Sequence, residues 1–340
     1  PKAGSMKKSS RERQTKERQT KEQIEIMAVL LAITGWDVEH WQDRFSRLLP
    51  QKQVYSLGQA YDPATIDYVM SWKHPPGSLQ SLPKLKAIFS LGAGVDHLLQ
   101  DPHLPHVPVA RVVDPDLTAR MSEYVVLHCL SVLRQTKRYQ QQQQQVLWFD
   151  DRDQPAASDV RVGVMGLGVL GQDALAKLRM MGFQVSGWSR TARQLPGVDC
   201  YAGQQGLTEF LAKTDILVVL LPLTADTRSL INTDVLRSLA QDGALGGPVL
   251  INAGRGGLQV EADILACLAE GSLQEAILDV FETEPLPKTS PLWTHPAVTV
   301  TPHNAAMSSP DAIGRLVVEQ IARLERGEPL LHQVHLNRGY

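Results

Sequence analysis

The chain has 340 residues, which predicts two domains at roughly 150 residues per domain. Its 43% apolar and 21% charged residues are an ordinary globular balance, and they exclude wholesale disorder. The formal net charge is −2, but residues 1–22 hold eight Lys or Arg against three Glu, a local +5, so residues 23–340 sum to −7. A body this acidic is a poor binder of nucleic acid, whose affinity comes largely from neutralised phosphates.

A basic tail precedes the predicted fold. Residues 1–25 repeat Arg-Gln-Thr-Lys-Glu after a Gly-Ser-Met junction typical of a tag, so we expect a tag or a disordered segment there. The longest unbroken apolar run, Ile26–Ile33, has eight residues, far fewer than the roughly 20 that cross a bilayer. No signal-peptide cleavage site follows this run, and we interpret it as the first buried strand. A basic arm that binds an acidic partner is the alternative for the tail.

The cysteines and histidines argue against a disulfide framework and against a metal site. Cys129, Cys200 and Cys267 are odd in number, far apart and without CxxC spacing, which is typical of a reducing compartment. The histidines have no spacing that indicates a ligand set, so we predict no metal. The expected location is the cytoplasm, without a membrane or nucleic-acid partner.

Short apolar runs alternate with amphipathic stretches from residue 26 onward. Apolar strands separated by helices are typical of parallel sheets covered on both faces. We therefore predict an α/β protein with two doubly wound parallel sheets. The predicted strands are Met27–Ile33, Ile66–Trp72, Leu85–Ser90, Val160–Met165, Phe183–Trp188, Ile216–Leu221, Val249–Asn252, Ala276–Val280 and Val298–Thr301. Two of the helical segments between them are Asp173–Met181 and Glu261–Leu268.

A long stretch, Leu117–Gln145, separates the two α/β blocks. Its apolar residues recur at helical spacing, so we predict one long connecting helix. The stretch ends in six glutamines, Gln140–Gln145, which we interpret as a solvated helix end. The loop Asp150–Ser158 then leads into the next strand.

A glycine-rich turn follows the strand Val160–Met165. In the pattern GxGxxG, the first glycine permits a tight turn, the second lets the backbone approach a pyrophosphate, and the third lets helix and strand pack closely. The N-terminus of the following helix offers unpaired N–H groups to the anion. The strand, turn and helix together predict a dinucleotide site formed by Gly166, Leu167, Gly168, Val169, Leu170 and Gly171.

The end of the next strand indicates which dinucleotide is preferred. Sites selective for NAD place an Asp or Glu there, which hydrogen-bonds the 2′-hydroxyl of the ribose. Here Ser189, Arg190 and Thr191 follow, and no carboxylate occurs before Asp199. A guanidinium pairs well with a 2′-phosphate, which a carboxylate would repel. The sequence favours NADPH over NADH, and a solvated arginine is the alternative interpretation.

Three polar residues follow apolar runs in the second half of the chain. They are Arg255, Glu284 and His303. Ligands of open α/β sheets bind beyond the carboxyl ends of strands, so the three side chains would converge there. This set suits the reduction of a 2-oxo acid: the arginine clamps the carboxylate, the histidine donates a proton, and the glutamate favours the imidazolium form. Each residue taken alone also has a purely structural interpretation.

Several longer strings surround these residues. They are Asn252-Ala-Gly-Arg-Gly-Gly-Leu-Gln-Val260, Leu278-Asp-Val-Phe-Glu-Thr-Glu-Pro-Leu-Pro287 and Thr301-Pro-His-Asn-Ala-Ala306. With them, residues 27–340 resemble the D-2-hydroxyacid dehydrogenase family. Further support comes from Trp72-Lys-His-Pro-Pro76, Leu91-Gly-Ala-Gly-Val-Asp96 and Gly187-Trp-Ser-Arg-Thr191.

The resemblance implies a role for each matching residue. Arg255 would bind the substrate, Glu284 would partner the histidine, and His303 would donate the proton. Backbone N–H groups of Leu91, Gly92, Ala93 and Gly94 would bind the substrate carboxylate. Asp279 would lie beside the nicotinamide carboxamide. The remaining residues that would line the cofactor are Leu221, Pro222, Leu223, Thr224 and Ala253.

The resemblance also implies the order of the domains. A flavodoxin-like substrate domain would comprise residues 26–117 and 303–340, and a Rossmann domain, residues 118–302, would be inserted into it. The active site would lie between the domains, and homodimers would form around the inserted domain. Asn304 departs from the apolar residue expected after His303, so the local contacts are expected to differ there.

The implied reaction is the NADPH-dependent reduction of a small 2-oxo acid, with glyoxylate and hydroxypyruvate as the expected acceptors. Trp72, at the end of a strand, would limit the space beside C3 of the substrate; a core aromatic is its alternative interpretation. Two other functions stay open: a dehydrogenase for another small 2-oxo acid, and a regulator on the same fold that senses the dinucleotide with vestigial activity.

Overall fold

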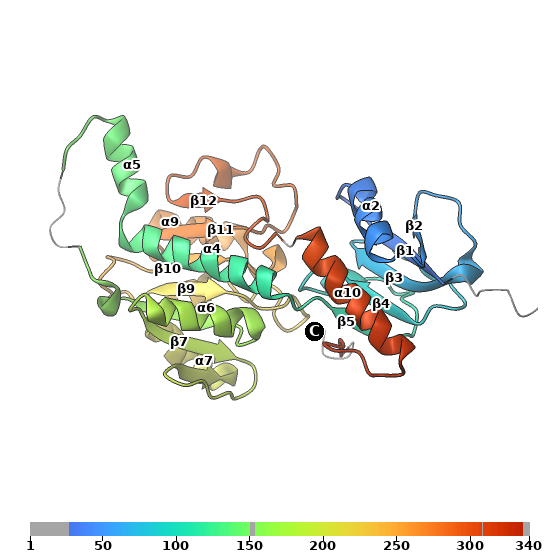
Figure 1. Ribbon diagram of the computed structural model, residues 1–340. Coiled ribbons are helices and arrows are strands. Elements are labelled where there is room, and N and C mark those ends of the chain that lie inside the picture. The colour runs from blue at the N-terminus through green and yellow to red at the C-terminus, as the bar shows by residue number, and fades with distance from the viewer. Residues whose placement is uncertain (1–26, 150–153, 308, 336–340) are drawn as a thin grey trace, which may run out of the picture. The chain divides into compact units, whose positions relative to one another are not determined.

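The structure, a computed structural model, describes residues 27–149, 154–307 and 309–335. These residues form two compact units, one of residues 27–112 with 313–334, the other of residues 113–312 with His335 (Figure 1). The basic tail predicted for residues 1–25 lies outside the described residues. The predicted domain limits, at 117/118 and 302/303, stay a prediction.

The first unit contains a five-stranded parallel sheet. Its strands are β1 (Ala28–Ile33), β2 (Gln53–Ser56), β3 (Ile66–Trp72), β4 (Ala87–Ser90) and β5 (Val109–Arg111). They lie in the order β2-β1-β3-β4-β5, and every neighbouring pair is parallel. This is the order of a flavodoxin-like sheet, which confirms the predicted fold of this part of the chain.

Alternate residues of these strands face two separate cores. On one face, Leu31, Met70 and Phe89 pack with the helices α2 (Val38–Leu48) and α10 (Pro310–Glu325). On the other face, Leu30, Val69 and Ile88 pack with the short helix α3 (Asp96–Leu99) and neighbouring loop residues. Burial on both faces explains why β1, β3 and β4 have almost uninterrupted apolar sequences.

The second unit contains a seven-stranded parallel sheet. Its strands are β6 (Arg161–Met165), β7 (Gln184–Ser189), β8 (Asp199–Ala202), β9 (Ile216–Val219), β10 (Val249–Asn252), β11 (Glu275–Leu278) and β12 (Val298–Val300). Their order is β12-β11-β10-β9-β6-β7-β8, so the chain starts in the middle, winds to one edge and then to the other. This is the doubly wound order of a Rossmann domain with a further strand, as predicted. The point where the order reverses lies between β6 and β9.

Helices cover both faces of this sheet (Figure 1). On one face lie α4 (Pro115–Leu133) and α6 (Val169–Met180), whose buried residues share a core with Val162, Ile216 and Ile251. The opposite face is covered by α7 (Gly203–Ala212), α8 (Thr233–Arg237) and α9 (Glu261–Glu270). Short 3-10 helices complete the elements: η1 (Pro63–Thr65), η2 (Ala157–Asp159), η3 (Gly256–Leu258) and η4 (Pro291–Trp293).

The single long helix predicted for Leu117–Gln145 is wrong, because the stretch forms two helices. The helix α4 ends at Leu133, and α5 (Thr136–Gln144) begins after Gln135, whose φ of +51° is in the left-handed region and interrupts the helical path. Gln140–Gln144 form the end of α5 and are largely exposed, which agrees with the predicted solvated helix end.

Three strands of the structure are absent from the prediction, namely β2, β5 and β8. All three lie at a sheet edge, where one side of the strand has no neighbour. Each is only three or four residues long, and β2 and β8 include polar or partly exposed residues. An edge strand of this kind has no continuous apolar run to reveal it. Among the described residues, no helix is long and apolar enough to cross a membrane.

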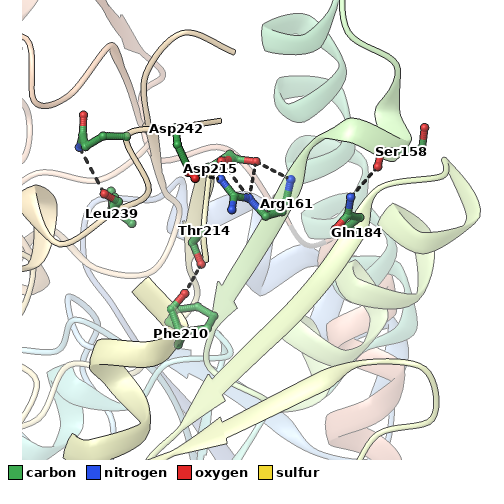
Figure 2. A network of polar contacts seen from close by, with 9 residues as sticks. Ser158, Arg161, Gln184, Phe210, Thr214, Asp215, Leu239 and Asp242 are labelled. Carbon is green, nitrogen blue, oxygen red and sulfur yellow. Dashed lines mark hydrogen bonds and ion pairs between the residues drawn. The ribbon is translucent and has the colours of Figure 1, made fainter. Parts of the chain in front are cut away.

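An ion pair joins the amino ends of two central strands (Figure 2). Arg161 begins β6 and Asp215 immediately precedes β9; Nη2 of the arginine lies 2.7 Å from Oδ1 of the aspartate. Asp215 is 1% exposed, and it also accepts the backbone N–H of Arg161 at 2.8 Å. These bonds raise the pKa of the Arg161 guanidinium. Loss of the Arg161 guanidinium would leave the buried charge of Asp215 without this partner, a change that typically costs about 3–5 kcal/mol.

Candidate active site

The candidate site of the second unit lies at the carboxyl edge of its sheet. Because all neighbouring strands are parallel, the segments that follow β6, β9, β10, β11 and β12 leave the sheet at the same edge. Open α/β sheets bind their ligands at this edge, where the strand order reverses. Each predicted catalytic residue lies in one of these segments.

The glycine-rich turn after β6 has the geometry that a pyrophosphate requires. Gly166 has a φ of +109°, and a Cβ there would lie 2.7 Å from the carbonyl oxygen of Leu220. A Cβ at Gly171 would lie 1.9 Å from the carbonyl oxygen of Gly166, so both positions accept only glycine. Gly168, by contrast, faces open space and precedes α6, whose N-terminus has no side-chain cap. An anion can therefore approach the first N–H groups of α6.

The residues between these glycines differ in accessibility. Leu167 is 2% exposed, and it packs where a side chain on Gly187 of β7 would otherwise lie. Its side chain therefore belongs to the core, and only its backbone is left for a ligand. Val169 is 43% exposed and Leu170 is partly exposed. Both lie in the first turn of α6.

The end of β7 has a cation beside a carboxylate. Arg190 lies directly after the strand, and its Nη1 is 3.5 Å from Oδ2 of Asp226. Both side chains are largely solvent-exposed. The hydroxyl of Ser189 donates to the carbonyl of Thr191 at 2.8 Å, which shapes the turn. Asp226 is a residue that the sequence analysis did not single out.

The segment after β9, Leu221–Thr224, forms a turn with a buried start. Leu221 is 8% exposed and packs in the core, whereas Pro222 is exposed and Leu223 and Thr224 are partly exposed. Thr227 stabilises the turn, because its hydroxyl donates to the carbonyl of Pro222 at 2.7 Å and accepts the N–H of Thr224 at 2.8 Å.

A buried amide network supports the backbone of Arg255. Asn252, at the end of β10, donates to the carbonyl of Arg255 at 3.2 Å and to Oε1 of Gln259 at 2.8 Å. Gln259 in turn donates to the carbonyl of Val280 at 3.0 Å. Asn252 and Gln259 are at most 2% exposed. The network joins the turn after β10 to the segment after β11.

Close backbone packing brings the same two segments together. A Cβ on Gly256 would lie 1.9 Å from the carbonyl carbon of Phe281, so the turn after Arg255 requires a glycine at that position. Ala253 is 6% exposed, and its N–H reaches the carbonyl of Val219 at 3.3 Å. Arg255 itself is partly exposed, and its Nη1 donates to the carbonyl of Gly254 at 2.8 Å.

Glu284 and His303 form a direct pair. Nδ1 of the imidazole lies 2.8 Å from Oε2 of the carboxylate, and the two side chains are 31% and 22% exposed. The other carboxylate oxygen of Glu284 accepts the N–H of Phe281 at 3.1 Å. His303 has a φ of +52°, a backbone conformation that costs energy for any residue with a side chain. The surrounding contacts must therefore hold it in place.

Asp279 supplies those contacts. Its carbonyl accepts the N–H of His303 at 2.8 Å. Its carboxylate accepts the hydroxyl of Thr301 at 2.6 Å and the N–H groups of Asn304 and Ala305 at 3.0 and 3.1 Å. The side chain is 1% exposed, so the acceptor oxygens are buried with the loop they hold. Whether Asp279 also contacts a nicotinamide stays a prediction.

In the first unit, Trp72 lies against the predicted carboxylate-binding turn. A Cβ on Gly92 would lie 2.3 Å from Cζ3 of the indole. The hydroxyl of Ser90 lies 3.1 and 3.0 Å from the carbonyl oxygens of Gly92 and Gly94, which share its single proton. Leu91 is 1% exposed, whereas Ala93 is partly exposed. Trp72 is partly buried and stacks on Trp36, with 4.6 Å between ring centroids. It therefore combines core packing with a position beside the turn.

The described residues hold no group of three or more His, Cys, Asp or Glu that would bind a metal ion. The three cysteines are all free thiols, and Cys129 and Cys267 are buried. Burial raises the pKa of the Cys129 thiol, which makes it unreactive.

Sequence reasoning missed the polar residues that support the site. Asn252, Gln259 and Thr301 touch backbone or carboxylate groups and leave no periodic pattern. Polar residues at the ends of apolar strands were the available signal, but this signal does not say which of them are buried. Tyr124 lies on the buried face of α4. In the sequence it therefore resembles another apolar residue of the helix.

Comparisons with known proteins agree with this architecture. The NAD-binding domain model of D-isomer specific 2-hydroxyacid dehydrogenases matches residues 126–305. The chain is 39% identical to glyoxylate/hydroxypyruvate reductase A of Escherichia fergusonii over 322 residues, which covers 92% of this chain and 100% of the relative.

Two solved structures have the same fold. One is the NADPH-dependent glyoxylate/hydroxypyruvate reductase from Sinorhizobium meliloti in complex with NADP and sulfate, with a TM-score of 0.88, 48% identity, and coverage of 92% of this chain and 100% of that chain. The other is a probable 2-hydroxyacid dehydrogenase from Rhizobium etli CFN 42 in complex with NADP, HEPES and L(+)-tartaric acid, with a TM-score of 0.87, 44% identity, and coverage of 93% and 100%. The chain therefore belongs to the D-isomer specific 2-hydroxyacid dehydrogenase family.

Proposed function

We propose that the protein catalyses the NADPH-dependent reduction of glyoxylate to glycolate and of hydroxypyruvate to D-glycerate. The observation that carries this proposal is the pair of His303 and Glu284, 2.8 Å apart at the carboxyl edge of a dinucleotide-binding sheet. Two relatives that are 39% and 48% identical bear the name glyoxylate/hydroxypyruvate reductase. A protein that only senses a dinucleotide has no need for such an acid–base pair.

The residues around the glycine-rich turn fit NADPH. The open space at Gly168 and the uncapped N-terminus of α6 suit a pyrophosphate, and the guanidinium of Arg190 suits a 2′-phosphate. When bound, NADPH supplies the hydride that the reaction needs. The solved relatives from Sinorhizobium meliloti and Rhizobium etli were crystallised with NADP.

The side chains of the site divide the remaining work. In the proposed mechanism Arg255 binds the substrate carboxylate and polarises the neighbouring carbonyl. As the hydride reaches C2, the imidazolium of His303 transfers its proton to the carbonyl oxygen, which becomes the 2-hydroxyl. Glu284 holds the ring by Nδ1 and stabilises its positive charge, which leaves Nε2 for the substrate. In the proposal the backbone N–H groups of Ala93 and Gly94 provide further donors for the carboxylate, because the N–H of Leu91 already donates to the carbonyl of Ser71 at 3.0 Å and that of Gly92 to the hydroxyl of Ser90 at 3.4 Å.

The direct test is oxidation of NADPH by the purified protein, followed by absorbance. We expect kcat/KM to be highest for hydroxypyruvate or glyoxylate, lower for pyruvate and lowest for phenylpyruvate. The indole of Trp72 packs on Gly92. In the proposal this rigid ring limits the space beside C3 and donates its N–H to the 3-hydroxyl of hydroxypyruvate. Trp72→Ala should admit larger acids and weaken hydroxypyruvate. Absence of turnover with every small 2-oxo acid would favour the alternative hypothesis, a regulator that senses the dinucleotide.

Variants of the three catalytic candidates test their roles. His303→Ala should lower kcat by roughly 10²–10⁴, the usual contribution of a positioned general acid. Arg255→Ala should raise KM and lower kcat, because this side chain both binds and polarises. Glu284→Gln should lower kcat, since the carboxylate that holds Nδ1 of the imidazole at 2.8 Å is replaced by a neutral amide. His40→Ala, an exposed histidine of the first unit, is the control, and a His303→Ala rate equal to the wild-type rate would refute the assignment.

Cofactor preference is tested at the end of β7. Ser189→Asp combined with Arg190→Ala should weaken NADPH binding by about 10- to 100-fold, the loss of a charge-assisted pair, and leave NADH nearly unchanged. Asp226→Asn should tighten NADPH by up to about fivefold, because it removes a carboxylate that competes for Arg190. Dissociation constants from fluorescence titration measure both effects, with the exposed Arg193→Ala as control. Equal kcat/KM for the two cofactors in the unmodified protein would contradict the preference.

The homodimer predicted around the second unit is part of the proposal. Val146–Phe149, directly after α5, exposes four consecutive apolar residues, and Trp148 is 97% exposed. Apolar patches of this kind are typical of protein interfaces. We expect light scattering to give the mass of a dimer, and Trp148→Ser to increase the monomer fraction. Trp293→Ser, at a 50% exposed tryptophan outside this segment, should leave the mass unchanged. A monomeric wild-type protein would refute this part of the proposal.

The cytoplasm stays the proposed compartment. Its support is the set of three free thiols, because a reducing environment keeps unpaired cysteines in this state.

A further inference from the structure

A chain of hydroxyl groups connects the helix α4 to the loop that carries His303. Tyr124 lies on α4, is 8% exposed, and has its hydroxyl 2.9 Å from Oγ1 of Thr301. The hydroxyl of Thr301 in turn lies 2.6 Å from Oδ1 of Asp279. These three side chains connect two distant parts of the sequence inside one compact unit.

The direction of the hydrogen bonds follows from the chemistry of the groups. An ionised carboxylate only accepts hydrogen bonds, so the single hydroxyl proton of Thr301 is donated to Asp279. Thr301 therefore has only lone pairs to offer Tyr124, and the phenol must donate to it. Burial raises the pKa of Tyr124, which keeps this donor protonated. Successive bonds in one direction polarise and strengthen one another.

Further contacts hold Tyr124 and Asp279, the two ends of this chain of hydrogen bonds, in place. The ring of His128, one turn further along α4, packs edge-on against Tyr124 with 4.3 Å between centroids. At the other end, the carboxylate of Asp279 binds the backbone N–H groups of Asn304 and Ala305. Its donors therefore lie on both sides of His303 in the sequence. The strained φ of +52° at His303 is maintained from both directions.

We infer that Tyr124 is a positioning residue for His303, which it orients through Thr301 and Asp279. This inference rests on the proposed function, in which His303 is the proton donor. The hydroxyl of Tyr124 bonds to Thr301 and acts on His303 through it. Tyr124 affects the position of the imidazole relative to the reacting carbonyl. A small displacement of a catalytic group slows the chemical step.

The variant Tyr124→Phe keeps the ring and removes the single donor. We expect kcat to fall about 3- to 12-fold, the equivalent of one hydrogen bond, with the dissociation constant of NADPH unchanged within about twofold. With NADPH deuterated at the transferred position, the isotope effect on kcat should increase, because the chemical step becomes more rate-limiting. Partial unfolding would instead lower kcat and leave the isotope effect as it is in the wild type.

Two variants of Thr301 test whether the groups act as a chain. Thr301→Ser keeps the hydroxyl and should retain most of the activity. Thr301→Val removes the hydroxyl. Adding Tyr124→Phe to this variant should lower kcat little further, because the hydrogen bonds from Tyr124 to Asp279 are already interrupted. Full additivity of the two substitutions would overturn the inference. If the valine variant does not fold, the serine variant and Tyr124→Phe still decide the question.

Ser122→Ala is the matched control. Ser122 lies two residues from Tyr124 on α4, is fully buried, and donates its hydroxyl to Asp173, outside the chain of hydroxyls. This variant should lose stability without a change in kcat or in the isotope effect. A loss of kcat equal to that of Tyr124→Phe would mean that α4 acts by general packing, and would overturn the inference.

A measurement without turnover separates this inference from the proposed function. In 15N-histidine NMR spectra, assigned with His303→Ala, the ring signals of His303 should shift in Tyr124→Phe and stay in place in Ser122→Ala. Absence of turnover in the wild-type protein would refute the proposed function, and the spectra would still report on the positioning. Normal turnover with unchanged kcat and unchanged His303 signals in Tyr124→Phe would overturn the positioning alone.

Discussion

The buried carboxylate of Asp279 accepts three hydrogen bonds from Thr301, Asn304 and Ala305, and these donors lie on both sides of His303. A carboxylate that is 1% exposed must be satisfied by donors, because an unpaired buried charge costs several kcal/mol. The loop after β12 supplies all three donors. The position of the imidazole is therefore a consequence of satisfying the charge of its neighbour.

The parallel sheet of the second unit makes this arrangement possible. Parallel pairing directs the segments after β10, β11 and β12 to the same edge, and these segments carry Arg255, Glu284 and His303. Buried amides then connect the segments: Asn252 and Gln259 join the turn after β10 to the carbonyl of Val280. The site consequently has a rigid support, which is what acid–base chemistry requires, since proton transfer depends on distances of about 3 Å.

The chemistry of the two ends of this sheet differs. At the amino edge, the buried carboxylate of Asp215 pairs with the partly exposed guanidinium of Arg161, and this pair joins β6 to β9. At the carboxyl edge, the buried carboxylate of Asp279 holds the loop, whereas the groups proposed to meet a ligand are more exposed: His303 is 31% exposed, and Arg190 at the end of β7 is 49% exposed. Charges that serve a ligand must stay accessible, and they contribute less to folding than a buried pair does.

The sequence alone determined the fold class, because the apolar strands and the glycine-rich turn depend on local physical requirements. Gly166 and Gly171 accept no side chain, and the interior strands are buried on both faces, so their patterns are unambiguous. Only the tertiary structure showed the edge strands β2, β5 and β8, the break at Gln135, and the partners Thr301, Gln259, Tyr124 and Asp226. The physical reason is that a hydrogen bond between residues far apart in the sequence produces no periodic pattern. The partner of each side chain is known only once the chain has folded.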